Sequence, residues 1–190
     1  MLTFLIIAGL LLLGIFYTVV IYNALIDLKN QVFKNWSNID VLLAQRNSEI
    51  TKLVESCKQY MKYEKETLEK IIQARNAHQN ASQSGDMQAL GNAENLLRAG
   101  LRQIFALAEN YPDLKSNNSF TQLQSRISGL ESAISDRREF YNESVNLYNI
   151  RIQQIPEVFL ANILNFKPSG LLRFSDEEKR DLDIKNLFNS

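Results

Sequence analysis

The first 26 residues of the chain contain no charged side chain, and only Thr, Gly and Asn interrupt their run of apolar residues. A helix of about 20 apolar residues, rising ~1.5 Å per residue, crosses a ~30 Å hydrocarbon core, and residues 2–22 meet that length. We therefore expect a single-pass transmembrane helix within residues 1–26. The lipid bilayer is then the first partner that the sequence predicts.

A cleavable secretory signal is the alternative interpretation of this segment. Such a signal has a basic start, an apolar core of ~7–15 residues and a cleavage site of small residues. This chain begins Met-Leu-Thr, its apolar run is longer, and no such site follows it. The sequence thus favours an uncleaved anchor. Lys29 and Lys34 follow the span and no cation precedes it, so the positive-inside rule predicts cytoplasmic residues 27–190 and an N-terminus outside.

Beyond the span, apolar residues recur at steps of three and four, which is the spacing of one helix face. No Pro or Gly lies between Ile15 and Ser84, so we expect the membrane helix to continue to about residue 80. Asp86 is expected to cap a second helix that Pro112 stops. The predicted fold class is all-α, an N-terminal transmembrane helix continuing into a long antiparallel helical bundle.

A third helix is expected to start at Asn118 or Ser119 and to end before Pro156, and a short fourth helix to follow it. From about Ser175 the composition is polar enough that we expect loose order. The expected organisation is a transmembrane anchor over residues 1–26, a helical-bundle domain over residues 27–166 and a polar C-terminal tail over residues 167–190.

The lengths of these helices leave an apolar stripe near the membrane without an obvious partner. The second helix, at ~1.5 Å per residue, is expected to cover only the outer half of the first. An exposed apolar stripe is a liability in a monomer, so we expect copies of the chain to associate through it as a homo-oligomer. The stripe consists of Leu25, Val32, Trp36 and Ile39.

Asparagine recurs beside tyrosine at heptad spacing. Asn lowers helix propensity, so its repeated use favours side-chain hydrogen bonds that fix helix register, with a solvated polar face as the alternative. These candidate register and association positions are Asn23, Asn30, Tyr141, Asn142, Asn146, Tyr148 and Asn149.

Composition argues against most kinds of chemistry. With 21 Lys and Arg against 21 Asp and Glu, the chain has no surplus of cations for nucleic acid. The sequence contains one His and one Cys, and no phosphate-binding loop or nucleophile elbow, so we expect no catalytic residue, cofactor, metal or small-molecule substrate. His78 is expected at the surface near a helix end, and Cys57 as a small buried hydrophobe.

A set of motifs extends along residues 1–166. The motifs are Tyr22-Asn-x-Leu25, Leu28-Lys-Asn30, Trp36-Ser-x-Ile-Asp-Val41, Arg46, Leu53-Val54, Tyr60, Tyr111-Pro-Asp-Leu-Lys115, Phe120, Arg137-Arg138, Tyr141-Asn142, Val145 and Tyr148-Asn149. In combination they resemble the bacterial LemA family. Two departures from the family pattern are Thr51, where relatives usually have Pro, and Asn165, where Gly is common. The resemblance implies an anchored antiparallel helical bundle of the bacterial inner membrane, in a family without established catalysis.

The sequence therefore predicts a non-catalytic, membrane-anchored helical scaffold that self-associates, organises other membrane proteins, or does both. One alternative is an adaptor or regulator of a membrane protease or signalling protein, in which partner binding is the function. Another is an enzyme whose pocket forms only in an oligomer.

Overall fold

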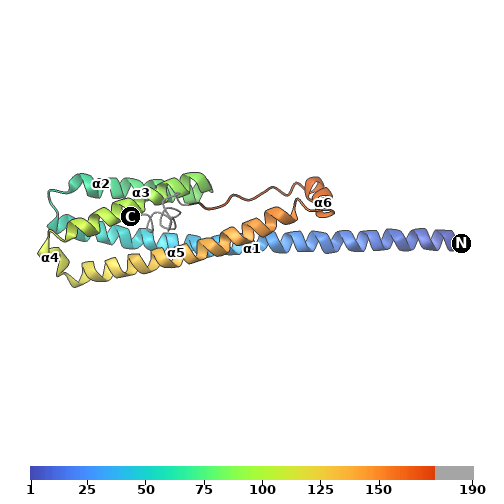
Figure 1. Ribbon diagram of the computed structural model, residues 1–190, viewed down its shortest axis with the longest axis horizontal. Coiled ribbons are helices and arrows are strands. Elements are labelled where there is room, and N and C mark those ends of the chain that lie inside the picture. Colours follow the sequence, from blue (N-terminus) through green and yellow to red (C-terminus); the bar gives the residue numbers. More distant parts are fainter. Residues whose placement is uncertain (174–190) are drawn as a thin grey trace, which may run out of the picture. The chain divides into compact units, whose positions relative to one another are not determined.

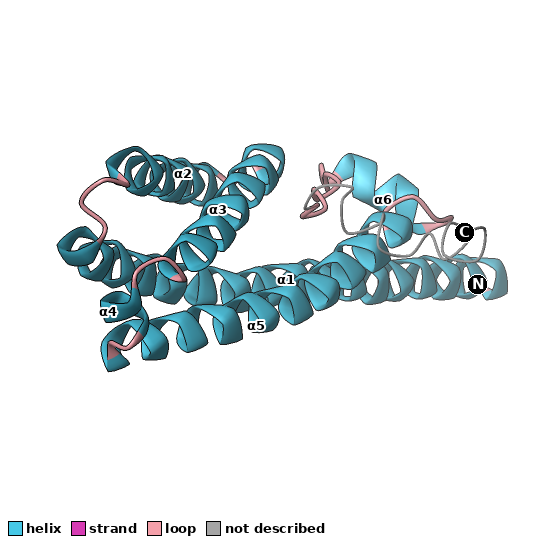
Figure 2. Cartoon of the chain, turned by 60° about the vertical axis from the view of Figure 1, so that its left-hand side comes forward, coloured by secondary structure: helices cyan, strands magenta, loops and turns pink. Residues whose placement is uncertain are grey.

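The computed structural model describes residues 1–173, and it contains six helices and no strand in that range (Figure 1, Figure 2). The predicted all-α class with a long N-terminal apolar helix is confirmed. The looser order expected from Ser175 falls outside the described residues. The helices are α1 (Leu2–Tyr60), α2 (Lys65–Ser84), α3 (Met87–Ala108), α4 (Pro112–Lys115), α5 (Asn118–Arg151) and α6 (Glu157–Ile163).

The first helix is shorter than the sequence predicts. It ends at Tyr60, and a four-residue turn leads into α2, although neither Pro nor Gly lies in this stretch. The physical reason is tertiary packing, because the turn allows Leu68 and Ile71 of α2 to be buried in the same core as Leu53 of α1. Burial of an amphipathic face stabilises helices more than local propensity does, so a local signal for the turn is missing.

The other helix ends follow local rules. The Asp86 carboxylate caps α3 by accepting hydrogen bonds from the backbone N–H groups of Gln88 and Ala89, as expected. Helix α5 begins at Asn118, and the amide oxygen of Asn117 accepts from Ser119 and Phe120. The short fourth helix expected near the C-terminus is α6, which starts after Pro156.

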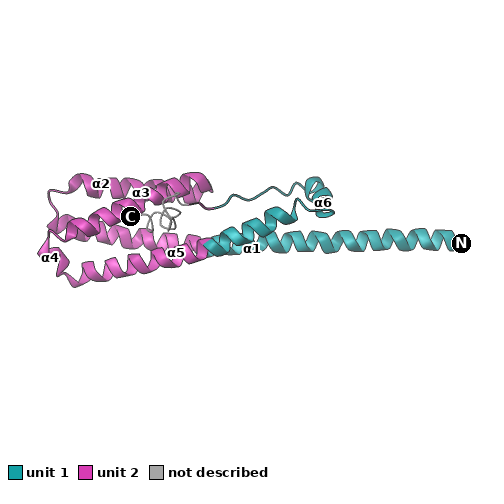
Figure 3. Ribbon diagram, viewed as in Figure 1, with its two compact units in different colours: residues 1–38, 139–171 teal, residues 39–138, 172–190 magenta. Residues whose placement is uncertain are grey.

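The described chain divides into two compact units, coloured separately in Figure 3. The first unit comprises residues 1–38 and 139–171, and the second comprises residues 39–138 together with residues from 172 onward. Helices α1 and α5 each contribute to both units. These units reflect packing between helices, and the anchor, bundle and tail expected from composition stay a prediction.

In the second unit, apolar side chains from α1 to α5 form one buried core. The contributions include Ile50 and Leu53 of α1, Leu97 and Leu101 of α3, and Ile127 of α5. Leu172, which follows the last residue of the first unit, belongs to the second unit and is buried. A Cβ atom at Gly91 of α3 would collide with the backbone of Arg173, so glycine is required where that segment approaches α3.

In the first unit, α1 and α5 bury a common apolar face. Leu25 and Val32 are buried, and the ring of the half-buried Trp36 lies 5.7 Å from that of Tyr141. In the second unit, Ile39 is buried as well. The expectation that this stripe lacks a partner within the chain is therefore wrong. Helix α5 supplies the partner, whereas the helix lengths predict only the second expected helix against α1.

The first 20 residues of α1, in contrast to this stripe, are not covered by other described parts of the chain. Their side chains are exposed almost throughout. Within the described residues, α1 is the one helix long and apolar enough to cross a membrane. Because these side chains are not packed in the protein, this part of α1 is not a buried core helix. It is a candidate membrane span.

Candidate functional site

Three α5 side chains hold the segment that follows α6. The Tyr148 hydroxyl donates to the carbonyl oxygen of Lys167 at 3.0 Å, and the Tyr141 hydroxyl donates to that of Gly170 at 2.9 Å. The side-chain amide of Asn149 both donates to and accepts from the backbone of Ser169. Burial raises the pKa of both tyrosines, so the phenols stay protonated donors at neutral pH.

These contacts place three of the sequence-predicted positions together. Tyr141, Tyr148 and Asn149 satisfy backbone groups of residues 167–170, which have no helix or sheet partner of their own. This segment, the start of the predicted polar tail, is bound against α5.

The other predicted asparagines lie at the surface. Asn23 and Asn30 are exposed on α1, Asn146 is exposed on α5, and Asn142 is half-buried. Their role in fixing register between helices or between chains remains a prediction.

The outer face of α5 in the first unit carries three large apolar side chains. Phe140, Leu147 and Ile150 are each about half exposed. Steps of seven and three residues keep them on one side of a helix, where Glu143 also lies. We call the three apolar residues the α5 stripe. An exposed apolar patch on a protein marks a surface that is used for contact, and single scattered residues do not.

A cluster of charged side chains is fully buried in the second unit. Arg46 of α1 donates two hydrogen bonds to the carboxylate of Glu94 of α3, at 2.7 Å and 2.5 Å. His78 of α2 places its Nε2 3.0 Å from the second oxygen of that carboxylate. All three side chains are buried. The cluster thus ties three helices together through one carboxylate.

The expected surface position of His78 is therefore wrong. Its ring is buried because α2 folds back along α1, which the sequence analysis did not foresee. Two signals were available: Arg46 interrupts the apolar stripe of α1, and Glu94 has the same helical spacing to Leu90 and Leu97 that defines the buried face of α3. Charged residues in the middle of two buried faces are expected to pair with each other.

The charges around Glu94 govern its ionisation. Burial alone raises the pKa of Glu94, but the hydrogen bonds and positive charges of Arg46 and His78 outweigh it and hold this pKa well below its usual range. Arg98 adds a further contact with the carboxylate at 3.0 Å. Burial raises the pKa of the neighbouring Glu131, and Arg46, 4.0 Å away, partly offsets this rise. Glu94 is thus an ionised carboxylate in a dry interior.

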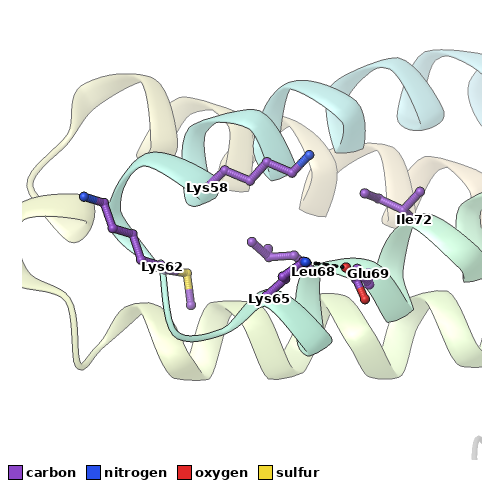
Figure 4. Close-up of a pocket in the computed structure, with 7 residues that line it drawn as sticks. Lys58, Lys62, Lys65, Leu68, Glu69 and Ile72 are labelled. Atoms are coloured by element: carbon purple, nitrogen blue, oxygen red, sulfur yellow. Dashed lines mark ion pairs between the residues drawn. The ribbon is translucent and has the colours of Figure 1, made fainter.

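A pocket of about 480 Å³ lies at the turn between α1 and α2 (Figure 4). Its floor is apolar, with Met61, Leu68 and Ile72, and its rim includes Lys58 and Lys62. Figure 4 shows the ammonium groups of these two lysines pointing apart, so they do not converge on one ligand position. The lining residues include no Ser, Thr, Cys or His side chain, and Lys65 is held in an ion pair with Glu69 at 3.7 Å.

The single cysteine and the possible metal ligands add no chemistry. Cys57 is buried in the core of the second unit, and burial raises its pKa to about 12, so its thiol stays protonated and unreactive. Among residues 1–173 no three His, Cys, Asp or Glu side chains are grouped so that they could hold a metal ion.

Comparison with known proteins gives relatives for the whole chain. A family model described as the LemA family matches residues 35–185. Protein LemA of Metamycoplasma hominis is 27% identical over 190 residues, which cover 98% of this chain and 85% of that protein. Magnetosome protein MamQ 2 of Paramagnetospirillum magneticum is 32% identical over 83 residues. This match covers 44% of the chain and only 30% of the MamQ protein.

Proposed function

We propose that this chain, which belongs to the LemA family, is a membrane-anchored helical scaffold that associates with copies of itself and thereby organises other membrane proteins. The observation that carries the proposal is the α5 stripe. It lies on the unit that also contains the candidate membrane span, so copies held in one bilayer present the same apolar face at the same height. Confinement to a membrane raises the effective concentration of such faces.

Anchoring is supported by the continuity of α1. A cleavable signal ends in a small-residue cleavage site, whereas α1 continues as one helix from the exposed apolar segment into Ile21 and Leu25, which are packed in the first unit. We place the protein in the bacterial inner membrane with a single span. Lys29 and Lys34 favour the cytoplasm for the helical units, with the N-terminus outside.

A non-catalytic role is supported by the kind of chemistry that the described residues offer. The cluster of Arg46, His78 and Glu94 is fully buried and joins three helices. The ammonium groups of Lys58 and Lys62 at the rim of the pocket do not converge on one ligand position. Both features fit a protein that works by contact. An adaptor for a membrane protease or signalling protein would use the same stripe for a different partner.

Self-association is tested by the mass of the full-length protein in mild detergent, measured by light scattering. We expect a discrete oligomer for the unmodified protein and a monomer for the double variant Phe140→Ser with Leu147→Ser. Leu96→Ser on α3 is the control, because it removes an exposed leucine outside the stripe.

Two outcomes contradict the scaffold. One is a monomer for the unmodified protein at every concentration, and the other is dissociation by Leu96→Ser as readily as by the double variant. Stable co-purification of a different membrane protein with a monomeric chain would favour the adaptor instead.

A further inference from the structure

Helix α6 exposes an apolar face that nothing in the described chain covers. Phe159 and Ile163 lie one turn apart on α6 and share a side, and Ile155 lies in the turn just before the helix begins. Phe159, Ile163 and Ile155 are 64%, 79% and 79% exposed, respectively. The exposed side of this short surface helix is therefore apolar, with a third large apolar residue in the turn before it.

The opposite side of α6 is turned into the protein and carries the charge. Glu157 is buried, and its carboxylate forms an ion pair with the Arg151 guanidinium at 2.6 Å. Ala161 is buried as well. A helix facing water has the reverse arrangement, with carboxylates outside and Phe and Ile inside. In α6 the apolar side chains lie outside and the carboxylate lies inside, as expected for a helix whose outer side faces an apolar surrounding.

The contacts that the residue after α6 makes with α1 indicate what this apolar surrounding is. The Phe166 ring, just after α6, lies 6.4 Å from the ring of Tyr22 and 5.7 Å from the ammonium of Lys29. Tyr22 closes the apolar run of α1, and Lys29 is the first cation after it. Helix α6 and this part of α1 belong to the same unit (Figure 3). Tyrosine and lysine at the end of an apolar span mark the level of the lipid headgroups.

The segment that joins α6 to the second unit fixes this arrangement. The hydrogen bonds of Tyr148 and Asn149 to residues 167 and 169 hold the chain after α6 against α5. The exposed face of α6 therefore belongs to a helix whose following segment is packed against α5.

We propose that α6 is an interfacial membrane element, whose exposed face of Phe159 and Ile163 lies, together with Ile155 of the preceding turn, in the boundary between lipid headgroups and acyl chains. The inference rests on the membrane anchoring proposed above. With α1 crossing the bilayer and α6 lying at its surface, the first unit has two points of attachment. These two points set the height and orientation at which the α5 stripe is presented.

The test uses the full-length protein in vesicles of phosphatidylethanolamine and phosphatidylglycerol. A fluorophore that is quenched by nitroxides is attached to Phe159→Cys, with Ile163→Cys as a second position. Leu11→Cys reports on the middle of the span, and Ser128→Cys lies 23 residues before the end of α5, or about 35 Å at 1.5 Å per residue. Native Cys57 is buried and stays unlabelled.

We expect nitroxides near the headgroups to remove most of the fluorescence at Phe159→Cys and Ile163→Cys, and nitroxides in mid-chain to remove most of it at Leu11→Cys. Ser128→Cys is expected to keep its signal. If Leu11→Cys is quenched while both α6 labels behave like Ser128→Cys, anchoring holds and the α6 inference is wrong, with water or a second copy against that face. If Leu11→Cys is not quenched, the anchoring itself fails.

Discussion

Replacing Glu94 with alanine is expected to lower the free energy of unfolding by about 3–5 kcal/mol, the usual result of removing one partner from a buried ion pair. The variant leaves the guanidinium of Arg46 without a carboxylate in a dry interior, where its nearest remaining acid is Glu131 at 4.0 Å. His78 loses its 3.0 Å contact at the same time. The loss of stability therefore comes mainly from leaving the charge of Arg46 buried without its partner, and less from the lost attraction between the two groups.

The measurement is urea unfolding of the full-length protein in mild detergent, followed by far-ultraviolet circular dichroism. Glu66→Ala is the control, because it breaks an exposed ion pair with Lys70 and is expected to leave the midpoint unchanged. The double variant Arg46→Met with Glu94→Leu removes both charges and is expected to be more stable than Glu94→Ala. A Glu94→Ala midpoint equal to that of the unmodified protein would contradict the role given to the cluster.

The pH dependence of stability follows from the same cluster. Because the pKa of Glu94 is lower in the folded protein than in the unfolded chain, the carboxylate binds protons more readily after unfolding. Its contribution to stability is complete above the unfolded pKa and is lost progressively as the pH falls below it. Glu94→Ala is expected to flatten this part of the stability curve.

Replacing Leu97 with alanine is expected to cost about 2–5 kcal/mol of unfolding free energy, because truncating a buried leucine removes transfer energy and leaves a cavity. Leu97 is fully buried in the core of the second unit, whereas its neighbour Leu96 is 65% exposed. Leu96→Ala is therefore the matched control and is expected to change stability by no more than about 0.5 kcal/mol.

The same urea titration compares the two leucine variants. Equal midpoints for Leu96→Ala and Leu97→Ala would mean that α3 does not pack with the face that the structure assigns to it. A much larger loss for Leu97→Ala supports the core of α1, α2, α3 and α5.

The features predicted correctly from the sequence depend on patterns that are local along the chain. A long uncharged run predicts the apolar helix, and the spacing of three and four predicts the helical class. Asp86 identifies the start of α3 because a capping carboxylate acts within one turn. Each of these signals is complete within a few residues, so no knowledge of packing was needed.

The features that were missed depend on which helices meet. The end of α1 at Tyr60 has no Pro or Gly to mark it, and it is stabilised by the burial of α2 against the core. His78 is buried only because of that fold-back. The stripe at Leu25 and Val32 is covered because α5 extends along α1 in the first unit. A pattern of apolar spacing shows that a face is buried and does not show which face covers it.

Self-association through the α5 stripe is tested by disulfide cross-linking of full-length Leu147→Cys in native membranes under mild oxidation. Gln31→Cys, an exposed position on α1, is the control, and the unmodified protein checks that the buried Cys57 forms no cross-link. Self-association through the α5 stripe predicts a covalent dimer for Leu147→Cys and little for Gln31→Cys. No dimer for Leu147→Cys, or equal dimer formation at both positions as random collision would produce, would contradict self-association through this stripe.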